Sequence, residues 1–197
     1  TSFDADPRLW NVNVPDLHLR PGSPCIDAGN PAAPPDPDGS RAEVGAHAFD
    51  SYYCAPALNY CTAKTNSLGC VPQIAAFGDT YGGPWAPSLW ITCEHVLNNK
   101  LGVLFYGTGG RASGPFQGGT LCLALPTRRT TIQLSGGSVS GSDCTGVYAF
   151  DFGTWITSGA DPALAPGAQV NAQYWSRDPQ STASAGLSDG VELVICN

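Results

Sequence analysis

Residues 97–126, LNNKLGVLFYGTGGRASGPFQGGTLCLALP, decide the fold class of this chain. The stretch contains two apolar runs, 103–106 and 121–125, each with the length of a buried strand. Between them lie fourteen residues with six glycines and one proline, a composition typical of turns. We therefore expect the two runs to form a central antiparallel strand pair with a long connection.

The chain after residue 50 continues this pattern of short apolar segments between Gly-, Pro- and Asp-rich separators. Such period-two segments predict an antiparallel β-sandwich of seven or eight strands. The one predicted helical turn is 158–164, SGADPAL. The predicted strands are 89–96, 102–106, 119–125, 130–134, 146–152, 169–175 and 191–196. Side chains predicted to share one face of a strand are Tyr148, Phe150 and Phe152, then Val170, Ala172 and Tyr174 (with Asn171 and Gln173 opposite), then Val191, Leu193 and Ile195.

The composition supports an all-β fold. A chain of 197 residues with 24 glycines, 17 prolines and only 13% charged residues is poor in what long exposed helices need. A hydrophobic content of 42% argues against disorder. Because the net charge is −7 and only Lys64 and Lys100 are lysines, we expect no nucleic-acid partner. No apolar run reaches 18 residues, so we expect no membrane span.

The cysteine content is even and contains no CxxC pair, which favours disulfides over a zinc site and predicts an extracellular or cell-surface location. We expect Cys61 to pair with Cys70 across a compact loop and Cys122 with Cys144. The second bridge would add about 3 kcal/mol by restricting the unfolded chain. The other four cysteines allow three pairings, of which we prefer 25–54 with 93–196. The eight cysteines are Cys25, Cys54, Cys61, Cys70, Cys93, Cys122, Cys144 and Cys196.

Residues 1–50 have a different character, with short strands expected at 15–20, 25–29 and 44–46, a proline-rich extended segment from residue 30, and a tight turn at 36–39. The pieces PGSPCIDAGNP and PPDPDGSRAEVGAHAFD, in that order, resemble the final coil of right-handed parallel β-helices. Such coils end the pectate-lyase-like repeat regions of large secreted bacterial proteins. The resemblance implies a β-solenoid-like coil at 1–50, followed by a linker at 51–60.

Residues 60–197 show a second resemblance, which covers the predicted domain 61–197. The motifs YCTAKTNSLGCVP, NNKLGVLFYGTGGRASGPFQGGTLCL, CTGVYAFDF, VNAQYWSRDP and LSDGVELVIC are similar to a C-terminal domain of large secreted proteins of planctomycete-type bacteria. The resemblance implies a β-sandwich domain outside the cell and brings no activity with it. Cys93 departs from the family, where an ordinary strand residue is expected, so the resemblance does not support a disulfide through Cys93.

A single solenoid coil cannot bury its own face, because solenoids need about three stacked units. We therefore expect the coil to stack on upstream coils, on the domain that follows it, or on another copy of the chain, as in a filament. The function that follows is a non-catalytic extracellular structural or assembly module.

The alternative function is a carbohydrate-binding or cell-surface targeting module of a polysaccharide-acting β-helix protein. Tryptophan faces stack on sugar rings, although they also pack in cores. Trp175 is the best candidate because it follows an alternating strand and precedes the SRDP turn; Trp85, Trp90 and Trp155 are the others. Arg111 and Phe116, in the glycine-rich connection 107–118, are candidates for an interface or for packing.

Asp36 and Asp38 flank a glycine turn and are candidate calcium ligands, with Asp27 or Glu43 as further oxygen donors. The full D-x-[DN]-x-[DN]-G spacing is absent, so a turn capped by Asp is the other interpretation. The three histidines show no metal-ligand spacing, no G-x-S-x-G motif is present, and glutamate is scarce. We therefore expect no enzyme activity.

Overall fold

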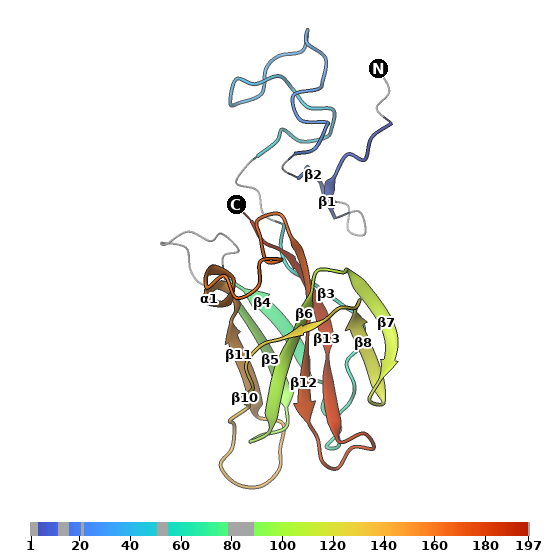
Figure 1. Ribbon diagram of the computed structural model, residues 1–197, viewed down its shortest axis with the longest axis vertical. Coiled ribbons are helices and arrows are strands. Elements are labelled where there is room, and N and C mark those ends of the chain that lie inside the picture. Colours follow the sequence, from blue (N-terminus) through green and yellow to red (C-terminus); the bar gives the residue numbers. More distant parts are fainter. Residues whose placement is uncertain (1–3, 12–15, 21, 51–54, 79–88, 197) are drawn as a thin grey trace. The chain divides into compact units, whose positions relative to one another are not determined.

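The computed structural model describes residues 4–11, 16–20, 22–50, 55–78 and 89–196. The chain divides into two compact units, one of residues 1–55 with 196–197 and one of residues 56–195. Figure 1 shows that the second unit holds most of the strands.

The first unit begins with an antiparallel hairpin of β1 (Leu9–Asn11) and β2 (Asp16–Leu19), which confirms the strand predicted at 15–20. Residues 25–29 and 44–46 form turns and bends, so the strands predicted there are wrong. The two segments nevertheless run side by side, because Val44 N–H donates to the Cys25 carbonyl at 3.0 Å and Gly29 N–H to the Ala42 carbonyl at 2.7 Å. The approach requires glycine at position 29, where a Cβ would lie 2.4 Å from the Ala42 oxygen. The solenoid coil stays a prediction.

The second unit contains one short helix and eleven strands among the described residues. Asp151 caps the helix, since its Oδ1 accepts the Thr154 N–H at 2.9 Å. The helical turn predicted at 158–164 is wrong, because the helix ends before it. The helix is α1 (Phe152–Thr157), and the strands are β3 (Leu58–Tyr60), β4 (Gln73–Phe77), β5 (Trp90–Val96), β6 (Leu101–Gly107), β7 (Arg111–Phe116), β8 (Gly119–Leu123), β9 (Arg128–Arg129), β10 (Gln133–Leu134), β11 (Gly146–Asp151), β12 (Gln169–Arg177) and β13 (Ala185–Val194).

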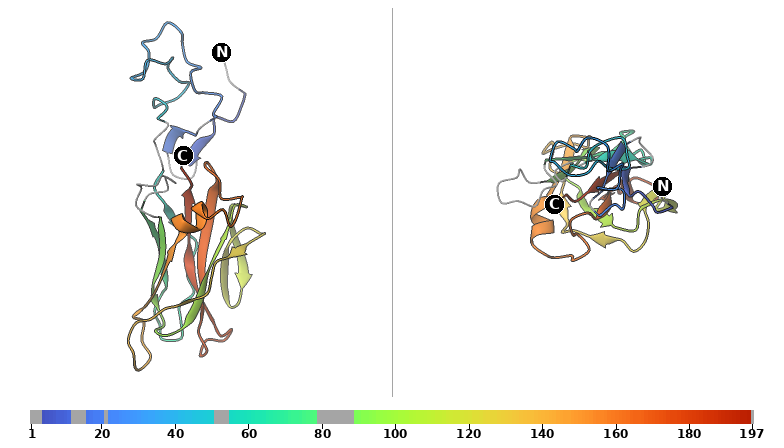
Figure 2. Two further views of the ribbon diagram at one scale, coloured as in Figure 1. Left: turned by 60° about the vertical axis from the view of Figure 1, so that its left-hand side comes forward. Right: turned by 90° about the horizontal axis from the view of Figure 1, so that it is seen from above.

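These strands form a two-layer antiparallel sandwich with a hairpin on its outside, which confirms the predicted all-β, disulfide-stapled fold. The large sheet has the order β10-β6-β12-β13-β3, with β9 also paired to β6. The small sheet has the order β11-β5-β4, and β7 pairs only with β8 among the described strands. In Figure 2 the yellow-green hairpin β7–β8 stands to one side of the orange and red strands β12 and β13. Strand β3 lies within the predicted linker.

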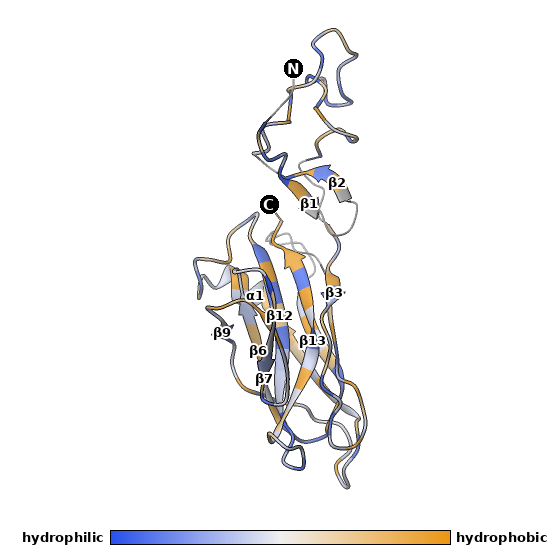
Figure 3. Ribbon diagram, turned by 90° about the vertical axis from the view of Figure 1, so that its right-hand side faces the viewer, coloured by the Kyte–Doolittle hydropathy of each residue, from blue (hydrophilic) through white to orange (hydrophobic). Residues whose placement is uncertain are grey.

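The core fills the space between the two sheets. Val170, Ala172 and Tyr174 of β12 all face it, as their alternation predicted, and Figure 3 shows the alternating bands of hydropathy along β12 and β13. The Tyr174 ring stacks on Tyr148 of the small sheet at a centroid distance of 5.2 Å. Gly102 makes room for this stack, because a Cβ there would lie 2.4 Å from the Tyr148 ring.

The strand pair expected within residues 97–126 does not form. Strand β6 pairs with β12 on one edge and with β9 and β10 on the other, so it has no edge left for β8. The glycine-rich connection supplies its own strand, β7, which pairs with β8. Strand β6 is central in the large sheet, as expected, but the second apolar run lies in the outer hairpin.

The four preferred disulfide pairings are all wrong. Cys61 bonds Cys122, and Cys70 bonds Cys144. Cys25 and Cys93 are free, buried thiols, which excludes the predicted pairs 25–54 and 93–196. Cys196 is disulfide-bonded, and Cys54 lies outside the described residues.

A candidate binding groove on the outer face of the large sheet

Alternation along β6 sends neighbouring side chains to opposite faces of the large sheet. Leu104 and Tyr106 enter the core between the sheets. Val103 and Phe105 point outward and form a second apolar cluster with Leu123 of the hairpin. The outer face is therefore apolar as well, and the hairpin β7–β8 covers part of it.

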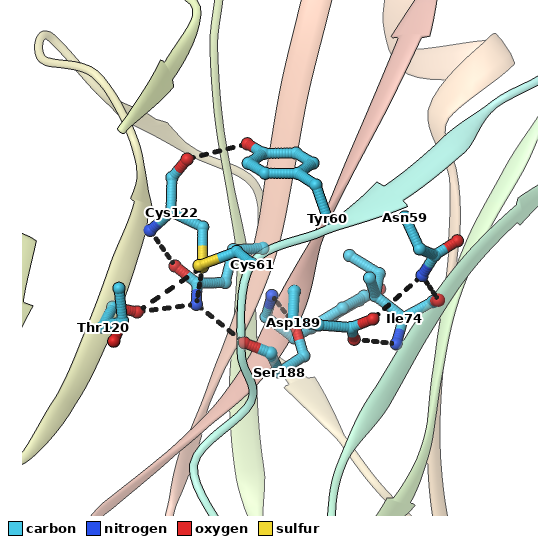
Figure 4. Close-up of a disulfide and its surroundings, with 10 residues drawn as sticks. Asn59, Tyr60, Cys61, Ile74, Thr120, Cys122, Ser188 and Asp189 are labelled. Atoms are coloured by element: carbon cyan, nitrogen blue, oxygen red, sulfur yellow. Dashed lines mark hydrogen bonds between the residues drawn. A yellow bond between two sulfur atoms is a disulfide. The ribbon is translucent and has the colours of Figure 1, made fainter. Parts of the chain in front are cut away.

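The Cys61–Cys122 disulfide fastens the hairpin to the large sheet. Cys61 follows directly on β3, and Cys122 lies in β8. Tyr60 adds a hydrogen bond from its hydroxyl to the Cys122 carbonyl at 2.7 Å, as Figure 4 shows. Partial burial raises the pKa of Tyr60 to about 12, so the phenol remains a hydrogen-bond donor at neutral pH.

The amide of Gln173 is a second tie between the hairpin and the sheet. Gln173 is fully buried on the outer face of β12. Its Oε1 accepts the Cys122 N–H at 3.0 Å, and its Nε2 donates to the carbonyls of Thr120 (2.9 Å) and Ser188 (2.7 Å). A buried amide is stable only when its donors and acceptor are satisfied. This one is hydrogen-bonded to backbone groups of both the hairpin and the large sheet.

The third tie is an ion pair between Arg111 of β7 and Glu192 of β13. Arg111 Nε and Nη2 donate to the two carboxylate oxygens at 2.8 and 2.9 Å, and the guanidinium lies 4.6 Å from the Tyr60 ring centroid. Burial acts to raise the pKa of Glu192, but hydrogen bonds from Arg111 and Asn171 outweigh it and lower the pKa. Arg111, a predicted interface candidate, thus lies in this internal contact.

The tip of the hairpin is held by Lys64. Gln117 and Gly118 both have positive φ, 46° and 76°, which is the geometry of a two-residue type I′ turn. Lys64 Nζ donates to the Gln117 carbonyl (3.0 Å), Ser181 Oγ (2.7 Å) and the Ala185 carbonyl (2.7 Å), so all three of its protons are used. The turn in this way fixes Gln117, whose Oε1 accepts the Trp175 indole N–H at 2.5 Å.

Beside the hairpin, the outer face forms an open groove of about 630 Å³. Its floor is made by β6 and β12, one wall by the hairpin tip, and the other wall by residues 129–132. The lining side chains that carry the argument are Leu101, Val103, Phe105, Phe116, Trp175 and Ile132. A groove of this size lies in the range of about 300–1,000 Å³ typical of ligand sites.

The apolar surface of the groove continues onto its rim. Val103 and Phe105 are 8% and 5% exposed, whereas Leu101 is 51% and Ile132 70% exposed. Phe116 meets Phe105 edge-on at a centroid distance of 6.3 Å. Two of the predicted ligand or interface residues, Trp175 and Phe116, therefore come together in the groove.

Two arginines are the charged members of the lining. Arg129 lies with its Cζ 5.2 Å from the Phe105 ring centroid, and Arg177 follows Trp175 on the same face of β12. In the described parts of the chain, neither guanidinium lies within ion-pair distance of a carboxylate. By contrast, Arg128 pairs with the buried Asp161 at 2.8 Å.

Two of the other candidate tryptophans, Trp90 and Trp155, lie away from the groove and form no shared sugar platform with Trp175. Trp90 is partly exposed on β5 of the small sheet. Trp155 lies on α1 and donates its indole N–H to the Tyr106 hydroxyl at 3.1 Å, against the core. Trp85 is outside the described residues.

Of the calcium candidates, Asp36 and Glu43 lie side by side, whereas Asp38 is engaged within its own turn. Asp38 caps its own turn by accepting the N–H and hydroxyl of Ser40 at 2.9 and 2.6 Å, which lowers its pKa. Asp36 lies beside Glu43, and each has one buried carboxylate oxygen without a hydrogen-bond partner. Burial, and then this neighbouring carboxylate, raise the pKa of Glu43. Within the described ranges, no three His, Cys, Asp or Glu residues gather in a way that would hold a metal ion.

The sequence interpretation missed Lys64, Gln173, Arg129 and Arg177. The alternation that placed Gln173 opposite the core residues was its available signal, and the same alternation carries Arg177 to the face of Trp175. Nothing local marks Lys64, because its three partners come from two distant segments. None of the helices that the structure describes is long and apolar enough to cross a membrane.

We compared the chain with protein-family models, curated proteins and solved structures, and none of them matches it.

Proposed function

We propose that this chain is a non-catalytic structural or assembly module that works outside the cell and contacts other protein through the groove. The observation that carries the proposal is the continuous apolar surface from the buried floor, Val103 and Phe105, to the exposed rim, Leu101 and Ile132. Exposed apolar patches of this kind are characteristic of protein interfaces. The disulfides support an oxidising location.

Self-association into a filament or surface layer is the form of assembly that the sequence analysis favours. Light scattering on the full chain over a range of concentrations tests it. We expect species larger than the monomer that decrease in Ile132→Asp, because this side chain is 70% exposed and its replacement leaves the core intact. A chain that remains monomeric at the highest concentration contradicts self-association.

Carbohydrate binding is the second candidate, favoured by Trp175 in the groove between a glutamine and two arginines. An indole face with nearby hydrogen-bond donors is a common sugar-binding arrangement. Glycan-array binding that is lost in Trp175→Ala but retained in the control Trp90→Ala would support it. Binding that both variants retain would contradict a role for the groove.

A further inference from the structure

The positions of Arg129 and Arg177 define what the groove can hold. Arg129 pairs with Phe105 across β9 and β6, and Ser176, just before Arg177, pairs with Gly102. The two arginines thus lie at opposite corners of the floor, about four residues apart along β6 and two strand spacings apart across it. With about 3.3 Å per residue and 4.8 Å between strands, their backbones are about 16 Å apart.

Between these corners the floor is apolar. Val103 and Trp175 are directly opposite each other in the β6–β12 register, with Phe105 and Leu101 on either side of Val103 along β6. A complementary ligand therefore has an apolar middle and an anionic group at each end. Because a guanidinium forms strong paired hydrogen bonds with carboxylates, the two ends are best supplied by carboxylates.

We propose that the groove binds one extended peptide segment of a partner chain, with apolar side chains between two acidic residues four or six positions apart, so that both carboxylates lie on the face that meets the arginines. An extended chain covers about 13 Å in four residues and about 20 Å in six, which brackets the backbone separation of the two arginines. The exposed apolar rim at Leu101 and Ile132 favours a protein over a sugar, since a sugar would leave it uncovered.

The size of the groove favours a segment over a second folded copy. Its volume of about 630 Å³ is that of a site for one small ligand or a few side chains. A stable protein–protein interface buries about 1,600 Å² in total, so a second folded copy would have to make contacts well beyond the groove. The hairpin wall is preformed by the Cys61–Cys122, Gln173 and Lys64 ties, so binding does not have to order it first.

This inference rests on the proposed function only in placing protein binding in the groove. The probe is a labelled heptapeptide with glutamate at both ends and with leucine and phenylalanine at its third and fifth positions, so that all four side chains share one face of the extended chain. Its binding to the full chain is measured by fluorescence anisotropy. Its controls carry glutamine at both ends or have the two glutamates adjacent. We expect the probe to bind at least tenfold more tightly than either control, with affinity that falls as salt rises.

The matched variants separate charge from folding. Arg129→Gln with Arg177→Gln should weaken probe binding at least tenfold, while Lys100→Gln, which removes a positive charge outside the groove lining, should leave it unchanged. Arg129→Glu with Arg177→Glu should reject the probe and bind a peptide with lysine at both ends. This rescue cannot arise from an unfolded variant.

Equal binding of the probe and its controls, or binding that survives the double charge reversal, would overturn the inference. If light scattering shows self-association that the groove variants abolish while no peptide binds, the occupant is a second copy. The proposed function then holds, and this inference fails. If the chain binds no protein but binds a glycan in a way that depends on Trp175, both the proposed function and this inference are overturned.

Discussion

The two faces of the large sheet are both apolar, but they are covered by different kinds of interaction. The inner face is covered by the small sheet through apolar contact, with Leu104, Val170 and Tyr174 almost completely buried. The outer face is covered by a hairpin that a disulfide, an ion pair, a buried amide and a lysine hold in place. Apolar packing between the sheets covers the whole inner face. The few specific bonds that hold the hairpin leave part of the outer face uncovered, and that uncovered part is the groove.

The largest effect should come from removing the outer tie that is covalent. Loss of the Cys61–Cys122 disulfide in Cys61→Ala with Cys122→Ala should lower the free energy of unfolding by about 4 kcal/mol, because the bridge closes a loop of 61 residues in the unfolded chain. Denaturant unfolding measures the change.

The matched control is Cys70→Ala with Cys144→Ala, which opens a loop of similar length, 74 residues. The global loss should be similar in the two variants. Hydrogen exchange in β7 and β8 should accelerate only when Cys122 is released. Equal protection of β7 and β8 in both variants would show that the disulfide does not hold the hairpin.

Adjacent positions on β6 compare the two faces directly. Leu104→Ala on the inner face should cost about 3 kcal/mol, since it leaves a cavity in a close-packed core. Val103→Ala on the outer face should cost about 1 kcal/mol, because it borders an open groove and removes less surface. Equal losses in denaturant unfolding would mean that the groove is filled in solution.

The inner face could be predicted from the sequence because it depends on local alternation. The side chains at 148 and 150, at 170, 172 and 174, and at 191, 193 and 195 all contact the core, as expected. Phe152 contacts it too, but as the first residue of α1 and not on the predicted strand 146–152. Period two determines which side chains share a face, and no knowledge of the partner sheet is needed.

The outer face could not be predicted, because its ties join residues that sequence proximity does not relate. Sequence proximity pairs Cys61 with Cys70, nine positions away, yet β3 lies beside β13, under the hairpin that carries Cys122. Likewise hydrophobicity alone pairs the apolar run at 121–125 with the run at 103–106. The short strands β9 and β10, with few apolar residues, instead occupy the free edge of β6.

The Arg111–Glu192 ion pair of the outer face should affect how the free energy of unfolding changes at acidic pH. Arg111→Ala leaves Glu192 buried without its cation and should cost about 2 kcal/mol at neutral pH. In the wild type the pKa of Glu192 is lowered, so its stabilising effect is complete above the unfolded pKa near 4.5 and is lost as the pH falls through the folded pKa. Arg111→Ala should therefore flatten the stability profile below pH 4.5. An unchanged acid profile would contradict the assignment.

The smallest expected effect is a difference in phenol pKa between the tyrosines of the outer and the inner face. Tyr60 on the outer side has a pKa of about 12, whereas deeper burial raises the pKa of Tyr148 and Tyr174 further. A raised pKa means that the neutral phenol stabilises the fold fully below the unfolded pKa near 10, and that this contribution is lost as the pH rises toward 12. The ultraviolet difference between wild type and Tyr60→Phe should show one phenol ionising near pH 12 before unfolding. Ionisation near pH 10 would mean that the hairpin leaves Tyr60 open to water, and that the outer cover is looser than its ties imply.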